Sequence, residues 1–121
     1  MKMANGVTLR KIESLDQLAK GAEVIVTRRS LFPGVDPDYT THGTVGQVNQ
    51  MGVFIDNYMS VNGIRKIDPE NAQVLVDDLR RDYISILGIL NVPKRHRRSG
   101  LFLGGSYPSD SVTFYVVEKQ E

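Results

Sequence analysis

The strongest chemical signal in the sequence is a short basic cluster, Lys94-Arg-His-Arg-Arg98. It contains four of the chain's 15 lysine and arginine residues, although the net charge of the whole chain is only +1. Each phosphate that a lysine or arginine neutralises adds roughly 0.9 to the dependence of log affinity on log salt for duplex DNA. The cluster therefore predicts salt-sensitive contact with phosphates. The alternative interpretation is a solvated connector whose cations lie at the negative, C-terminal end of a preceding helix.

Other basic pairs could enlarge such a surface if the fold brings them to one side. The predicted nucleic-acid-binding residues are Lys94, Arg95, His96, Arg97, Arg98, Arg28, Arg29, Arg65 and Lys66. Stacking on bases needs aromatic side chains among the cations, and these are sparse. Phe32 and Tyr39 are possible stacking residues if residues 30–42 form a binding loop rather than a lid over the core. Tyr58 and Tyr107 are further candidates, with a partly buried rim position as the alternative, so backbone contact is the more economical hypothesis.

Catalytic chemistry finds little support in the sequence. The chain has no cysteine, and its two histidines, His42 and His96, are not at a spacing typical of a metal site or a catalytic triad. The glycine-rich stretch 100–105 lacks the Lys-Ser/Thr pair that a phosphate-binding loop requires. We therefore expect a protein that is not an enzyme, with no metal, no cofactor and no small-molecule substrate.

Length and composition fit one domain over residues 1–121. No apolar run approaches the roughly 18 residues that a membrane span needs, and the first residues have no apolar core of a signal peptide. The absence of cysteine fits a reducing compartment. The sequence therefore predicts a cytoplasmic protein with no membrane partner.

The elements that must position the basic cluster are arranged around residues 21–57. Apolar β-branched residues alternate in two runs bounded by glycine, 24–26 and 53–55, which is typical of strands. Between them, residues 43–48 predict a strand that leaves little room for side chains at its start. Residues 49–52 predict a turn whose last glycine takes a positive φ. Three short antiparallel strands with a curled entry indicate a small barrel.

This central stretch resembles the KOW motif, the short SH3-like barrel element of several ribosomal proteins and transcription elongation factors. The matching residues are Gly21-x-x-Val24-x-Val26, Gly43-x-x-Gly46-x-Val48 and Val53-x-Ile55. In that family the glycines allow close turns, the aliphatic side chains fill the barrel, and the loop after the first strand contacts RNA. Here the connection from Val26 to Gly43 is longer than the family's and has no lysine. The resemblance therefore implies the barrel fold but not the loop contacts.

Segments before and after the central stretch add further elements. Residues 7–12 predict an edge strand, and the capping-box pattern of Ser14 to Gln17 predicts one or two helical turns over 15–20. Residues 64–67 predict a fourth strand. The stretch 69–76 fits either the start of a helix or a last barrel strand.

The C-terminal third predicts a helix over 77–90, because its apolar residues recur at three- and four-residue steps. This helix is expected to pack on Ile25 and Phe54 of the barrel. The competing interpretation is that its apolar face binds a partner or a second copy. Alternating apolar residues then predict a terminal strand over 111–118.

The sequence thus predicts an α+β fold, a small SH3-like, KOW-type β-barrel with a C-terminal covering helix and a final strand. Its parts are 1–20 (strand and short helix), 21–76 (barrel) and 77–121 (helix, basic connector and strand). The leading function is non-enzymatic nucleic-acid binding through phosphate contacts, in a transcription- or translation-associated protein or a phage accessory protein. The alternative is a protein-interaction module that docks on or inhibits a macromolecular partner. Both DNA and RNA stay open.

Overall fold

The fold is described from a computed structural model of the chain. The described residues are 7–29, 39–62, 64–68, 73–76, 82–85, 89–90, 92–105, 107–109 and 111–119. All elements named below lie within these ranges.

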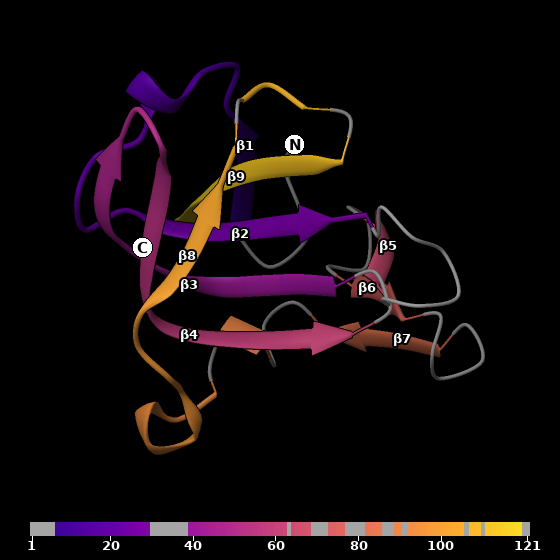
Figure 1. Ribbon diagram of the computed structural model, residues 1–121. Helices are drawn as coiled ribbons and strands as arrows, with labels where there is room; N and C mark the ends of the chain where they lie inside the picture. The colour runs from indigo at the N-terminus through magenta and orange to yellow at the C-terminus, as the bar shows by residue number, and fades with distance from the viewer. Residues whose placement is uncertain are drawn as a thin grey trace.

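Six antiparallel strands form the main sheet in the order β1-β9-β2-β3-β4-β8 (Figure 1). These strands are β1 (Val7–Lys11), β2 (Glu23–Arg28), β3 (Tyr39–Asn49), β4 (Gly52–Asn62), β8 (Leu101–Gly104) and β9 (Val112–Lys119). A second, three-stranded antiparallel sheet has the order β5-β6-β7. Its strands are β5 (Ile64–Asp68), β6 (Gln73–Val76) and β7 (Asp82–Ser85). Two single 3₁₀ turns, η2 (Leu15–Gln17) and η4 (Lys94–His96), complete the described elements.

The β3–β4 hairpin confirms the central prediction, although both strands are longer than expected. Asn49 pairs with Gly52, and the Oδ1 atom of Asn49 accepts hydrogen bonds from the N–H groups of Met51 (2.8 Å) and Gly52 (3.2 Å). Gly52 has a φ of 153°, a region that favours glycine. An asparagine that closes its own turn and a following glycine therefore fix the register of this hairpin.

Two β-bulges bend this hairpin. The pairing skips Gly43 on β3 and the two residues between Asp56 and Met59 on β4, and it skips Gly46 on β3. Gly43 is buried, and a Cβ atom there would lie 2.4 Å from Cγ2 of Ile55 and 2.9 Å from the carbonyl oxygen of Asp56. The expected lack of side-chain room at the start of the strand is confirmed, and its cause is the close approach of β4.

One hydrophobic cluster fills the inside of the curled sheet. Strands β8 and β9 lie at different places in the sheet order, yet both contribute to this cluster, so the sheet curls back on itself. Its buried members are Ile12, Leu18, Val24, Val26, Val45, Val53, Ile55, Leu103, Phe114 and Val116. Val24 and Val26 belong to it because alternate residues of β2 face the same side.

The predicted SH3-like barrel is wrong, because the sheet is open. Its edge strands are β1 and β8, and no ladder joins them in the described part of the chain. A side chain spans the gap instead: the Tyr107 hydroxyl donates to the carbonyl oxygen of Ile12 (2.7 Å) and accepts from the N–H of Phe114 (3.4 Å). The rings of Tyr107 and Phe114 also meet edge to face, with centroids 5.1 Å apart. A barrel would need a continuous backbone ladder at this position.

The α+β class and the covering helix over 77–90 are also wrong. Within that stretch Asp82–Ser85 forms β7, and its only described residues in a helical conformation are Ile89 and Leu90. The apolar residues pair across strands, Leu75 with Tyr83 and Val74 with Ile84. The open question over 69–76 is answered for Gln73–Val76, which is a strand.

The expected packing of this helix on Phe54 is therefore wrong as well. Phe54 is exposed and lies against Phe102 of β8, with ring centroids 4.7 Å apart.

Near the N-terminus, β1 confirms the predicted edge strand, and the only helical structure at 15–20 is the single 3₁₀ turn η2. Gln17 reaches back as predicted, and its Oε1 atom accepts from the N–H of Glu13 (2.6 Å). The other half of the capping box is wrong, because the Ser14 hydroxyl caps no backbone N–H and donates to the Asp16 carboxylate.

Candidate nucleic-acid interface

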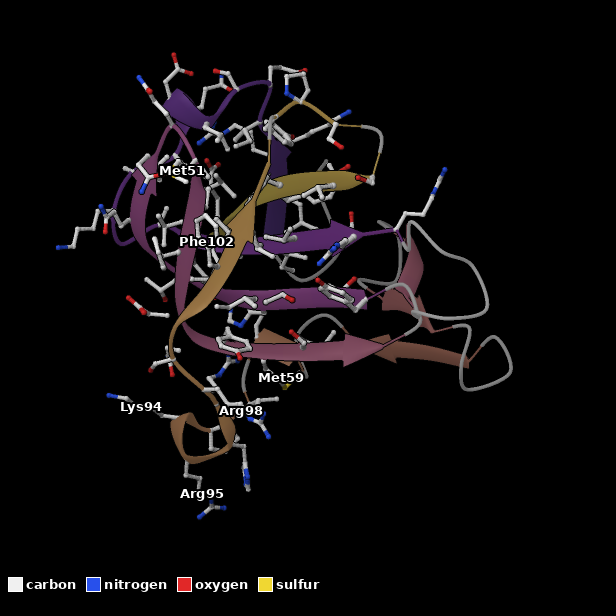
Figure 2. The ribbon with its side chains drawn as sticks, viewed as in Figure 1. Met51, Met59, Lys94, Arg95, Arg98 and Phe102 are labelled. Carbon is white, nitrogen blue, oxygen red and sulfur yellow. The ribbon has the colours of Figure 1, made fainter. Side chains whose placement is uncertain are left out.

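The basic cluster forms a short loop that projects away from the large sheet (Figure 2). The turn η4 starts after Pro93, where proline cannot continue a preceding helix or strand ladder. It is closed by hydrogen bonds from His96 N–H to the Pro93 carbonyl and from Arg97 N–H to the Lys94 carbonyl, both 3.0 Å. Lys94, Arg95 and His96 are exposed. With Arg98, which is also exposed, four of the five predicted residues in the cluster therefore face solvent.

Arg98 joins this loop to strand β4. Its N–H donates to the carbonyl oxygen of Tyr58 (2.9 Å), and the N–H of Tyr58 donates to the carbonyl oxygen of Arg98 (2.7 Å). This isolated antiparallel bridge comes just before β8 begins at Leu101. The Arg98 side chain is exposed and lies beside Met59 of β4 (Figure 2).

Arg97 points the opposite way and is half-buried under the loop. Its Nη1 atom donates to Nδ1 of His42 (2.7 Å), its Nε atom to the carbonyl of Val92 (2.9 Å) and its Nη2 atom to the carbonyl of Ile89 (2.8 Å). Weaker bonds reach the carbonyls of Asn57 (3.2 Å), Leu90 (3.3 Å) and His42 (3.4 Å). A planar guanidinium with five N–H groups can serve this many acceptors, whereas a lysine could not. Arg97 thus anchors the loop and is not available to a phosphate.

The bulge in β4 builds part of this anchor. Asn57 lies outside the β3–β4 ladder and has a φ of 51°, a left-handed conformation that asparagine adopts more readily than most residues. Its carbonyl oxygen is an acceptor for Arg97. The absence of a side chain at Gly43, which lies across the bulge, lets the two strands approach closely enough to form it.

His42 links Arg97 to a carboxylate. Because a guanidinium can only donate, the Nδ1 atom of His42 must accept, and its proton must sit on Nε2. That Nε2 atom lies 2.7 Å from Oε1 of Glu23, to which it donates. Burial lowers the pKa of Arg97, and the nearby carboxylate of Glu23 opposes this shift. The row Glu23–His42–Arg97 therefore holds a neutral histidine between a carboxylate and a guanidinium.

A groove of about 430 Å³ lies between the loop and the end of β4. Two tyrosines, two cationic or ionisable side chains, a hydroxyl and apolar stems share its walls. The lining residues are Tyr39, Tyr58, Met59, Ser60, His96, Arg98 and Leu101. The Ser60 hydroxyl is paired with the hydroxyl of the buried Thr41 at 2.7 Å. Rings beside cations on an open surface are the combination that binds a nucleic-acid strand, since bases stack and phosphates pair.

Of the remaining predicted cations, the two whose side chains the structure describes, Arg28 and Arg29, do not line this groove. Arg28 is half-buried at the end of β2, where its Nη1 atom donates to the hydroxyl of Tyr39, and its guanidinium carbon is 5.3 Å from the centre of that ring. Arg29 is exposed and next to it in the chain. Arg65 and Lys66 belong to β5, but their side chains lie outside the described part, as does Phe32. Arg28 is connected to the groove indirectly, through its hydrogen bond to Tyr39.

Sequence reasoning did not find Met59, Ser60 and Leu101 as lining residues of the groove. Their types carry no charge or motif, and only the pairing of Tyr58 with Arg98 brings β4 and the loop together. The role of Arg97 was also missed. The one available signal was Pro93, which ends the preceding segment but does not indicate which of the following side chains turns inward.

Among the described residues, no group of three or more histidine, aspartate or glutamate side chains could hold a metal ion. The same residues contain no helix of the length and apolarity that a bilayer crossing requires. Comparison with protein-family models, with curated proteins and with solved structures gives no match to this chain. The resemblance to the KOW motif therefore stays a prediction.

Proposed function

We propose that the chain is a non-enzymatic nucleic-acid-binding protein that contacts phosphates through the loop of η4. What supports this best is that His96 and Arg98 line one groove with Tyr39 and Tyr58, while Lys94 and Arg95 stand exposed beside it. The proposed surface is smaller than the predicted one, because Arg97 is used inside the protein.

The anchoring of the loop favours binding. Arg97 ties it to the carbonyls of residues 89, 90 and 92 and to His42, and the Tyr58–Arg98 bridge ties its other end to β4. A cationic loop that is already fixed loses less conformational entropy when it binds than a free one. A ligand that binds the exposed cations displaces no carboxylate from them within the described part of the chain, because the Arg10–Glu118 ion pair and the His42–Glu23 hydrogen bond both lie elsewhere.

The test is fluorescence anisotropy with labelled single-stranded and duplex DNA and RNA at two salt concentrations. The variant changes Lys94, Arg95 and Arg98 to Gln. Its matched control changes Arg10, Lys11 and Lys20, which are also exposed and are not among the predicted binding residues, to Gln and so alters the net charge equally. If three phosphates are contacted, a fourfold rise in salt should weaken binding by the unchanged protein about 40-fold.

We expect the Lys94/Arg95/Arg98 variant to lose most of this salt dependence and the control to keep it. Equal loss in both variants would mean that binding follows net charge, and the proposed interface would be wrong. No binding at low salt would instead favour the second candidate, a protein-interaction module.

One observation supports that second candidate. Met51, Phe54 and Phe102 are 76%, 37% and 43% exposed and lie around the β3–β4 turn and β8. Methionine and aromatic side chains are enriched in protein interfaces. Binding of a partner protein would then depend on Phe54 and Phe102 and would be unaffected in the Lys94/Arg95/Arg98 variant.

A cytoplasmic location is part of both proposals and is supported by the absence of cysteine.

A further inference from the structure

A second hollow opens where the main sheet fails to close. It has a volume of about 540 Å³ and lies between β8 with the segment after it and strands β2 and β9. Its walls include the buried core residues Val53, Leu103 and Phe114 together with the exposed ring of Phe102. Sites for small ligands in proteins are typically of about 300 to 1,000 Å³ and mostly apolar. This groove has the size and the walls of such a site.

Arg28 supplies a cation at this groove. Arg28 is half-buried, its guanidinium donates to the hydroxyl of Tyr39, and it forms no ion pair with a carboxylate of the described residues. A partly desolvated cation that lacks a carboxylate partner favours an anion beside it. The neighbouring Arg29 is exposed to solvent and does not line the groove.

Two hydroxyls stand in the same wall. Ser109 and Ser111 line the groove, their Oγ atoms are 2.9 Å apart, and the Oγ atom of Ser109 accepts from the N–H of Ser111 (3.1 Å). The carbonyl of Ser111 accepts from the N–H of Arg29 (2.7 Å), which holds this segment against the end of β2. Since Ser109 already accepts from the backbone, it can donate to Ser111, and the Ser111 hydroxyl is left to donate to a ligand.

We propose that this groove binds a small amphipathic organic anion, with its carboxylate at Arg28 and its hydrocarbon part against Val53, Leu103 and Phe114. This site is separate from the η4 loop, and the inference does not depend on nucleic-acid binding. It adds a ligand class that the sequence did not predict, because the groove exists only where β8 and β9, distant in the sheet order, face each other.

The test compares octanoate with 1-octanol, which share a hydrocarbon chain and differ in charge. Both are titrated into the isotopically labelled protein while backbone amide shifts are followed by NMR. We expect saturable shifts at Val53, Leu103 and Phe114, with octanoate binding at least about tenfold more tightly than octanol. Arg28→Gln should remove that preference and leave octanol binding unchanged, and Arg29→Gln is the matched control that should bind like the unchanged protein.

Two further variants keep the result decisive if Arg28→Gln folds poorly. Arg28→Lys retains the charge and should retain most of the preference for octanoate. Tyr39→Phe removes the hydroxyl that Arg28 contacts but leaves the cation, so octanoate should bind at least as tightly as before. The proposal is wrong if the two ligands bind equally to the unchanged protein, if no saturable shifts occur at the three core residues, or if Arg29→Gln weakens octanoate as much as the changes at Arg28.

Discussion

Arg97 differs from its neighbours in what its side chain contacts, although nothing in the local sequence sets it apart. Lys94, Arg95 and Arg98 are exposed, whereas the guanidinium of Arg97 serves backbone carbonyls and the ring of His42. The residues that receive it lie up to 55 positions away in the chain. A cluster of like residues can therefore contain both a surface for a ligand and the anchor that holds it.

Replacing Arg97 tests this division at the level of single residues. Arg97→Met should lower the free energy of unfolding by about 1.5 to 3 kcal/mol, the range for hydrogen bonds to a charged group, because buried acceptors lose their donor. Arg95→Met should change it by less than about 0.5 kcal/mol, since Arg95 is exposed and its one hydrogen bond to a described residue is to Nε2 of His96, at 3.3 Å. Urea unfolding measures both. Equal effects would show that Arg97 is no anchor.

At the residue scale the sequence identified the basic cluster but could not predict which of its side chains is exposed and which turns inward. Charge and residue type predict that Lys94 to Arg98 can contact phosphate, and exposure of four of these five residues is compatible with that. Which one turns inward depends on where a bulge places the carbonyl of Asn57 and on His42 lying beneath the loop. Those are contacts between distant segments, and no local pattern encodes them.

Among the elements, the bent hairpin of β3 and β4 gives a prediction with an internal control. Gly43→Ala should destabilise the protein by about 1 to 3 kcal/mol, as overpacking does, because the new methyl group meets the Ile55 side chain and a backbone carbonyl. Gly46→Ala should cost less than about 1 kcal/mol, because the three atoms nearest to its methyl group all belong to the Asp56 carboxylate, whose side chain is exposed and can rotate away.

Thermal or urea unfolding of the two glycine variants measures these two losses of stability. A Gly46→Ala variant as unstable as Gly43→Ala would mean that Asp56 is held rigidly, and the account of the second bulge would need revision. A Gly43→Ala variant as stable as the unchanged protein would contradict the close approach of the strands.

The hairpin was predictable and the helix was not, for a physical reason. A turn with asparagine and glycine between alternating β-branched residues fits one structure. In contrast, the segments that hold Leu75 and Tyr83 are short enough to satisfy a period of two and a period of 3.6 at once. Pairing of β6 with β7 decided the outcome, since it satisfies the backbone of both segments. The four-residue strand β8 was missed because glycines and aromatics around it resemble a loop.

For the whole molecule, alkaline pH should weaken the fold through β9. Tyr115 lies on this strand, paired with Lys11 on one side and Ile25 on the other. Burial raises the pKa of Tyr115, and the nearby Tyr107 raises it further. The unfolded chain then loses this proton at a lower pH, about 10, than the folded protein does. Stability is therefore complete below about pH 10 and falls as the pH rises toward the folded value.

Urea midpoints measured between neutral and alkaline pH check this expectation. Tyr115→Phe has no proton to lose, so it should show a shallower loss of stability on the alkaline side. An identical alkaline loss in the two proteins would assign the effect to other groups.

The position of β9 between β1 and β2 also constrains how the protein can be made. During synthesis, residues 7–28 emerge early, and β2 can pair with β3 soon afterwards. The described ladder of β1 and the second ladder of β2, however, both need residues 112–119. Pairing over such separations closes a large loop and is slow. The nascent chain must therefore leave β1 and one edge of β2 unpaired until nearly all of the described sequence has been translated.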